Sequence, residues 1–144
     1  VPKALQGVVV WANHTRIEKM EGDFGTPGAK ITELANVVPR LFNAGVSYRT
    51  PGGRFFVQLS TNYQAARPTQ NLPATSAAAQ RLPRQEDYQF WNMEASYRLT
   101  RSVRLTCTAR NLYSERPRFT EMGILRNTQQ ATGIAWLFAT KIDL

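Results

Sequence analysis

The sequence has little of what disulfides, metal sites and membrane-spanning helices require. It contains one cysteine, Cys107, and one histidine, His14, so we expect no internal disulfide and no Cys and His cluster that holds a metal. Its longest apolar runs, residues 8–12 and 134–139, are far shorter than the ~20 residues of a spanning helix. We therefore expect no metal, no cofactor and no transmembrane helix, and a catalytic role is not expected either.

Charged residues are also sparse, at 19%, whereas hydrophobic residues make up 42% of the chain and the mean hydropathy is -0.38. This is not the composition of a disordered chain. A length of 144 residues is enough for a single domain with its own core and too short for two well-packed domains. A multidomain enzyme is therefore not expected.

The chain is basic, but its basic residues are dispersed. Eighteen Lys and Arg against ten Asp and Glu give a net charge of +8, and fourteen of the eighteen are Arg. These are spread from Arg16 to Arg126 without a run of adjacent basic residues, and no nucleic-acid-binding motif accompanies them. We therefore do not expect nucleic acid as a partner.

Apolar and polar residues alternate with a period of two, which is typical of strands with two unlike faces. Phe42, Ala44 and Val46, for example, alternate with small or polar residues. Five segments show this alternation clearly: residues 42–49, 55–63, 91–99, 103–110 and 134–142. A sixth, more ambiguous strand is expected over about residues 5–18. The sequence therefore predicts an all-β chain of about six antiparallel, up-and-down strands with no helix.

The parity of the apolar positions determines the connections between strands. The apolar positions change from even to odd numbers between residues 48 and 55, which requires a connection of even length. Thr50-Pro51-Gly52-Gly53 supplies two or four residues for it. Parity is kept between residues 99 and 103, so residues 100–102 form a three-residue turn. The other connections, about residues 19–36, 64–87 and 114–128, are long. One rim then carries the tight turns and both chain ends, and the other carries long loops, which is typical of an outer-membrane barrel.

The two faces differ in a way that favours a membrane. On the apolar face, aromatic residues are expected at both strand ends, as in the aromatic belts of membrane barrels: Tyr48, Phe55 and Tyr97 near the tight turns, and Tyr63, Tyr88 and Trp91 near the long loops. The other face carries Arg49, Arg54, Arg98, Arg104, Arg110 and Glu94. An Arg in mid-bilayer lipid costs roughly 2 to 4 kcal/mol, so we expect this face to line a wet lumen. The smallest membrane barrels have about 8 strands, so we expect the chain to be part of a larger barrel.

Residues 91–113 resemble a known family. Arg110-Asn111-Leu112-Tyr113, followed by a Pro-containing loop, is similar to the Asn-Leu-Phe or Asn-Leu-Tyr signature ahead of the last external loop in TonB-dependent outer-membrane receptors. The hairpin of residues 92–106 and Val38-Pro39-Arg40 at a strand entrance are also similar, so the resemblance covers nearly the whole chain.

The resemblance implies that residues 1–144 are the C-terminal portion of a receptor barrel of roughly 22 strands. The family takes up a scarce, large ligand, such as a metal chelate, cobalamin or a glycan, across the bacterial outer membrane in an energised step. Implied partners are outer-membrane lipid, the N-terminal strands and plug domain of the barrel, and TonB through that plug.

Two sets of residues are candidates for contact with the transported ligand. On the polar face, the three-residue turn sets Arg98 opposite Arg104, Glu94 opposite Thr108, and Asn92 opposite Arg110, which makes a basic ladder. This ladder either attracts an anionic ligand or pairs with acidic groups of the plug, and we favour the plug. The second set lies in the long loops and consists of Arg67, Gln70, Asn71, Arg84, Arg116 and Arg118.

Two other functions fit parts of the pattern. A soluble barrel would turn the apolar face inward around a lipophilic small molecule, and it would be monomeric in plain buffer. An enzyme or adhesin on a smaller outer-membrane barrel would need convergent His, Asp or Glu side chains at the long-loop rim, for which one histidine gives little support.

Overall fold

The computed structural model describes residues 6–19, 22–23, 30–31, 34–70, 83–122, 124–128 and 133–142. Within these ranges the chain is all-β, without a helix, and every strand pair is antiparallel. No helix in the described part of the chain is long and apolar enough to cross a membrane. The predicted all-β class is confirmed.

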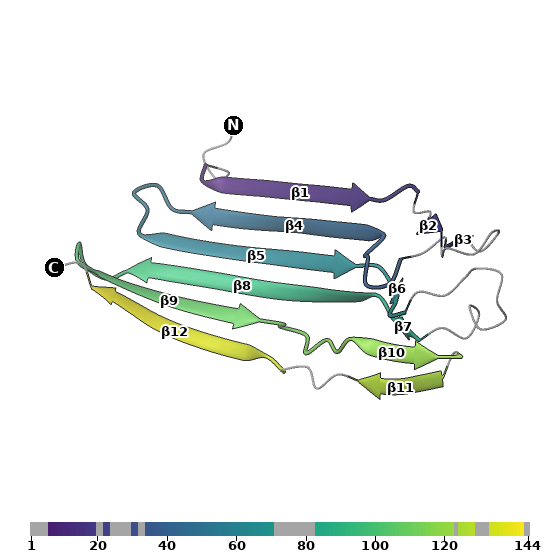
Figure 1. Cartoon of the computed structure of the whole chain (residues 1–144). Helices are drawn as coiled ribbons and strands as arrows, with labels where there is room; N and C mark the ends of the chain where they lie inside the picture. Colours follow the sequence, from purple (N-terminus) through teal and green to yellow (C-terminus); the bar gives the residue numbers. More distant parts are fainter. Residues whose placement is uncertain are drawn as a thin grey trace.

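The largest sheet has six strands, which follow one another across the sheet in chain order (Figure 1). It contains β1 (Val8–Arg16), β4 (Arg40–Arg49), β5 (Phe55–Gln64), β8 (Tyr88–Arg98), β9 (Val103–Arg110) and β12 (Ala135–Ile142). These are the six predicted strands, in the predicted up-and-down order. Among the described residues no sheet closes on itself, and β1 and β12 form the two edges.

Both predicted tight turns are present. The Thr50 N–H donates to the Phe55 carbonyl at 3.0 Å, so the connection from β4 to β5 is the four residues 51–54. It is even, as predicted, but shifted by one residue. The Leu99 N–H donates to the Val103 carbonyl at 2.9 Å, which leaves residues 100–102 as the predicted three-residue turn.

The two tight turns lie at one end of the sheet, which we call the turn rim, and the long connections lie at the other, the loop rim (Figure 1). The described chain ends also lie at the turn rim. The Arg49 N–H donates to the Gly7 carbonyl at 2.8 Å, and Ile142 pairs with Val103. The predicted asymmetry of the two rims is confirmed.

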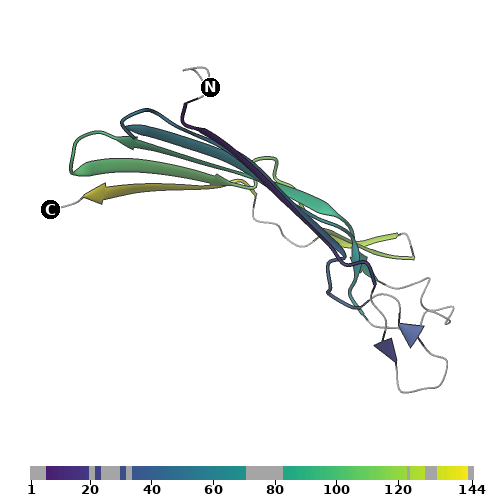
Figure 2. The same ribbon diagram turned by 90° about the horizontal axis from the view of Figure 1, so that it is seen from above.

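The described parts of the long connections contain short strands that the sequence does not predict. These are β2 (Gly22–Asp23), β3 (Lys30–Ile31), β6 (Arg67–Pro68), β7 (Arg84–Gln85), β10 (Arg118–Glu121) and β11 (Ile124–Thr128). Strands β11, β10, β7 and β6 form a second, four-stranded sheet beyond the loop rim (Figure 2). The predicted number of about six strands is therefore too low. Strands of two to five residues are too short to show alternation in the sequence. Their backbone groups are nevertheless satisfied by pairing with neighbouring strands.

The described part of the chain has no core of large hydrophobic side chains, although its length would allow one. Ala65 and Ala109 are the buried hydrophobic residues there, and no large side chain in it is fully buried. The reason is that the large sheet is a single layer (Figure 2), and no other described strand packs on its apolar face. Val10 and Phe138 are 74% and 75% exposed on that face.

The register confirms the two faces of the large sheet, with two corrections, for Arg54 and Tyr88. The Arg54 guanidinium, predicted on the polar face, lies over the ring of Tyr97 of the apolar face, because Arg54 is in the turn and outside the alternation of β5. Val46, Leu59 and Met93 are Cα partners in turn, and all lie on the apolar face. Tyr88, predicted in the outer aromatic belt of this face, pairs with Gln64, and its hydroxyl donates to the Gln64 Oε1 at 2.6 Å. Tyr88 therefore lies on the polar face, because alternation along β8 sets its side and its aromatic ring does not.

Candidate ligand-binding face

Three cationic residues stand side by side on the polar face at the turn rim. Arg98 on β8 is opposite Arg104 on β9, as predicted, and Arg104 is opposite Lys141 on β12. Like charges directly opposite each other destabilise a sheet unless something compensates them. This row therefore favours contact with an anionic group.

Glu94 lies farther along the same face, between the Cα partners Gln58 and Thr108, and its predicted position opposite Thr108 is confirmed. It lines two hollows. One, of about 240 Å³, also contains Arg49 and Arg104. The other, of about 410 Å³, is lined by Gln58, Ser60, Asn92, Met93, Glu94, Thr108 and Arg110. The structure thus brings Asn92 and Arg110 to one hollow, in which a carboxylate, amides, hydroxyls and a guanidinium are available to a polar ligand.

A row of amide side chains crosses the polar face near the loop rim. The Asn43 Nδ2 donates to the Asn13 Oδ1 at 2.9 Å, and the Asn62 Nδ2 donates to the Asn43 Oδ1. The Gln64 Nε2 continues the row with a bond to the Asn62 Oδ1 at 3.3 Å. The amides thereby satisfy one another's hydrogen-bonding groups. With the bond from the Tyr88 hydroxyl to Gln64, the row extends over four strands, β1, β4, β5 and β8. This row is not predictable from the sequence, because the contiguous apolar residues of β1 do not set its register with β4.

An aromatic ring also lies on the polar face. Trp11 is the Cα partner of Gly45, and a Cβ at position 45 would lie 2.6 to 2.9 Å from three indole atoms. The indole therefore covers Gly45, and only glycine leaves room for it there. Trp11 is 37% exposed, so part of the ring is available to a ligand. The sequence does not show which face of β1 carries Trp11, because residues 8–12 are all apolar and do not alternate.

The second sheet brings together three of the residues predicted to lie in loops. Arg67 lies in β6, Arg84 in β7 and Arg118 in β10, so the predicted long loops form short strands at these three residues. The Arg67 Nη1 donates to the Gln64 Oε1 at 3.0 Å, while its Nε is buried without a partner among the described atoms. The strands at these three residues pair over only a few residues each, which is too short a length to show as alternation in the sequence.

The other predicted loop residues are not brought to this sheet. Gln70 and Arg116 are exposed and lie in the connections that follow β6 and β9. Asn71 lies outside the described residues.

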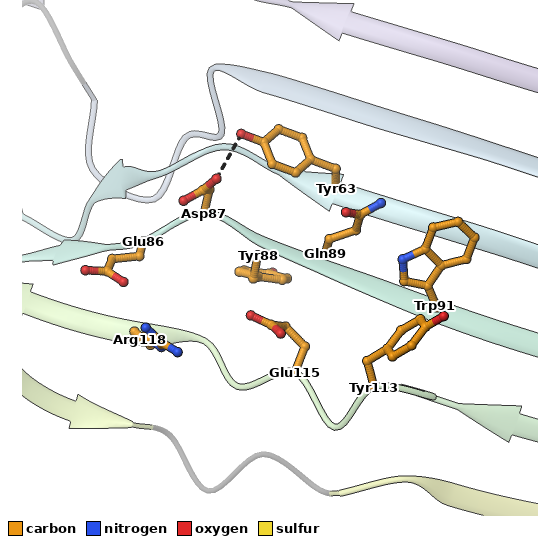
Figure 3. Close-up of a pocket in the computed structure, with 9 residues that line it drawn as sticks. All are labelled: Tyr63, Glu86, Asp87, Tyr88, Gln89, Trp91, Tyr113, Glu115 and Arg118. Atoms are coloured by element: carbon orange, nitrogen blue, oxygen red, sulfur yellow. Dashed lines mark hydrogen bonds between the residues drawn. The ribbon is translucent and has the colours of Figure 1, made fainter.

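A pocket of about 450 Å³, here called the rim pocket, opens where β8 meets the loop rim (Figure 3). Trp91 and Tyr113 form an edge-to-face pair with ring centroids 6.2 Å apart, and the Tyr63 hydroxyl donates to the Asp87 Oδ2 at 3.3 Å. Its lining residues are Tyr63, Glu86, Asp87, Tyr88, Gln89, Trp91, Tyr113, Glu115 and Arg118.

Of the predicted site residues, only Arg118 lines the rim pocket. Three carboxylates and one guanidinium make it locally acidic in a chain of net charge +8. With its aromatic walls, this arrangement suits groups that donate hydrogen bonds or carry positive charge. The rim pocket is not predictable from the sequence, because its residues come from three separate segments.

Asn111 holds the turn that carries Tyr113 and Glu115 to this pocket. It has a positive φ of 56° and is 8% exposed. Its Nδ2 donates to the Glu115 carbonyl at 3.0 Å, and its Oδ1 accepts from the Glu115 N–H at 2.8 Å. Asn tolerates the left-handed region better than most residues, which gives a physical reason for asparagine in the Asn-Leu-Tyr segment.

No group of three or more His, Cys, Asp or Glu in the described ranges is placed to hold a metal ion. Comparisons of the chain with protein-family models, with curated proteins and with solved structures found no match. The family resemblance therefore rests on the residues of the chain itself.

Proposed function

We propose that this chain is the C-terminal portion of the barrel of a TonB-dependent outer-membrane receptor and takes part in the energised uptake of a scarce, large ligand. One observation carries the proposal: the large sheet is a single layer whose apolar face is exposed, and no large described side chain is fully buried. A soluble domain covers such a face with a second layer. In a membrane barrel, lipid covers it.

The lengths of the strands support this function. β4 and β5 have 10 residues each and β8 has 11. A tilted strand that crosses a bilayer takes about 9–11 residues, whereas strands in soluble proteins most often have about 5–6. The short turns at one rim and long connections at the other would then correspond to the periplasmic and external sides.

The sheet edges and the basic row fit a larger assembly. Unpaired backbone groups at β1 and β12 would each cost several kcal/mol in lipid, and further strands of the same barrel would pair with them. Acidic groups of a plug domain would compensate Arg98 and Arg104, which are Cα partners on β8 and β9. TonB would act through that plug.

The ligand would reach the polar face from the loop rim, past the second sheet. Arg116 and Gln70 are exposed in the connections there. Deeper in the lumen, Trp11, the amide row and the hollow around Glu94 offer an aromatic face, amides and one carboxylate. These groups suit a large polar ligand of the metal chelate, cobalamin or glycan classes.

Site-directed spin labelling in the outer membrane tests the orientation. Nitroxides at Val46, Val57 and Ala95 should collide with bilayer oxygen and be shielded from an aqueous nickel reagent. Nitroxides at Ser47 and Gln58, on the other face of the same strands, should show the reverse. If the first three labels are shielded from oxygen and reached by nickel, the proposal is wrong.

One observation favours the second candidate, a soluble barrel around a lipophilic small molecule. The apolar face contains a hollow of about 380 Å³, lined in part by Phe55, Tyr97 and Phe138. A size like this suits a small apolar ligand. This function requires the chain to be monomeric and cooperatively folded in plain buffer, whereas the receptor requires detergent.

A further inference from the structure

The apolar hollow has the form of a shallow groove across the apolar face, close to the turn rim. Its floor is made by the small side chains of Ala95 and Cys107, which are Cα partners on β8 and β9. Phe138, on β12, is the partner of Cys107 and borders the groove on one side. Phe55 and Tyr97, which pair across β5 and β8, border it near the turns. This shape and lining suit an alkyl chain.

A positive charge stands at the end of the groove. The Arg54 guanidinium lies over the Tyr97 ring, 5.4 Å from its centroid, and Tyr97 also lines the groove. Arg54 is exposed, so its charge is available to a ligand whose apolar part lies on Tyr97. The aromatic ring already restrains the guanidinium, so a ligand that binds the guanidinium orders the Arg54 side chain little further.

Charge at the turn rim is mainly positive among the described residues. The basic residues there are Arg49, Arg54, Arg98, Arg101, Arg104 and Lys141, and one described carboxylate, Glu94, shares a hollow on the polar face with Arg49 and Arg104. Most of the described acidic residues lie toward the loop rim instead: Glu18, Glu86, Asp87, Glu115 and Glu121. Such a rim attracts an anionic lipid surface.

We propose that the groove binds an anionic glycerophospholipid, with one acyl chain on Ala95 and Cys107 and the phosphate on Arg54. This inference rests on the proposed function, because it requires the apolar face to lie in lipid with the turn rim at a membrane surface. A neutral lipophilic ligand would not use the guanidinium. A phospholipid uses both the apolar floor and the charge at its end.

The headgroup is tested with a charge variant and a matched control. The protein is purified from the membrane in mild detergent, offered dioleoylphosphatidylglycerol or dioleoylphosphatidylcholine, and the retained lipid is counted by native mass spectrometry. Phosphatidylglycerol should be retained in preference. Arg54→Gln should lower its retention about fivefold and leave phosphatidylcholine unchanged. Arg49→Gln should have no effect, because Arg49 lies over Phe56 on the polar face of the same rim, 5.1 Å from the ring centroid.

The acyl chain is tested by filling the floor of the groove. Ala95→Leu should lower the retention of both lipids, because the larger side chain occupies the space of the chain. Ala44→Leu is the control, since Ala44 lies on the same face, outside the groove. Circular dichroism of each variant establishes that the sheet is formed, and Arg54→Gln, in an exposed turn, keeps the test open if Ala95→Leu does not fold.

Three results would overturn the inference: equal retention of the two lipids by the unaltered protein, equal losses in Arg54→Gln and Arg49→Gln, or full retention in a folded Ala95→Leu variant. The receptor assignment fails by a different measurement, when labels at Val46 and Val57 are reached by aqueous nickel. Lipid-exposed labels together with an unaffected Arg54→Gln variant would reject the lipid site and leave the receptor.

Discussion

Replacement of Asn111 by alanine should destabilise the turn after β9 by about 3 to 4 kcal/mol. The change removes two hydrogen bonds, from the Nδ2 to the Glu115 carbonyl and from the Glu115 N–H to the Oδ1. A hydrogen bond contributes about 1 kcal/mol net. The φ of 56° adds roughly 1 to 2 kcal/mol, because alanine does not readily adopt the left-handed region.

Two further variants separate these contributions. Asn111→Gly keeps the positive φ and loses both side-chain bonds, so its cost should be about 2 kcal/mol. Asn36→Ala tests the backbone alone, since Asn36 has a φ of 61° and is exposed, and it should cost about 1 to 2 kcal/mol. The alanine variant at position 111 should therefore equal the other two effects combined.

The free energy of unfolding is measured by urea titration of the protein in lipid vesicles, with tryptophan fluorescence as the signal. Trp91 packs edge-to-face on Tyr113, two residues after Asn111, so its emission also reports the turn locally. If Asn111→Ala costs no more than Asn36→Ala, the side-chain bonds to Glu115 do not stabilise the turn and the reasoning is refuted.

Three more predictions follow from the two faces and the turns. Leu59→Arg on the apolar face should cost roughly 2 to 4 kcal/mol of folding free energy in vesicles, and its neighbour Ser60→Arg on the polar face should cost much less; equal costs would contradict the orientation. Gly45→Val should displace Trp11 from the sheet and increase iodide quenching of its fluorescence, and unchanged quenching would show that the indole does not need the space. Gly52→Ala should destabilise the chain by about 1 to 2 kcal/mol in urea titration through its φ of 86° alone, because nothing lies within 4 Å of the added Cβ.

The main sheet is predictable from the sequence because its strands are long and have unlike faces. Over eight to eleven residues, alternation repeats often enough to fix which side chains share a face. The parity of those positions then determines whether a turn has an even or odd length, as the connections at residues 51–54 and 100–102 illustrate. Arg98 opposite Arg104 follows from the same arithmetic.

For Tyr88, the alternation along β8 predicts the observed polar face, whereas its aromatic side chain suggested the apolar face. Tyr88 has the parity of Asn92 and Glu94, so it belongs with them on the polar face. An aromatic ring near a strand end resembles a membrane belt, but the alternating Cβ direction decides where the ring lies. The position of a residue along the strand therefore determines on which face its side chain lies, and the chemistry of that side chain does not.

The rim pocket and the second sheet could not be predicted, because local pattern does not determine them. Asp87, Trp91 and Glu115 meet only after the connections at the loop rim have taken their paths. Pairs such as β6 with β7 are two residues long, and pairing of that length depends on where the long strands end. Asn111 was a local signal that the sequence did offer, since an asparagine in a turn favours a positive φ.

The alternating pattern alone fits a lumen-lining sheet and the outside of a soluble barrel equally well, and the character of the polar face distinguishes them. Soluble surfaces consist to about 25–35% of charged residues. Here the middle of the face is formed by small or neutral residues, such as Ser47, Ser60 and Thr108, with Glu94 among them. The amide side chains of Asn13, Asn43 and Asn62 bond to one another, and an indole lies flat enough to require glycine beneath it. The small side chains in the middle of the face and the amides that bond to one another are suited to close contact with a plug or a ligand, and this favours the lumen.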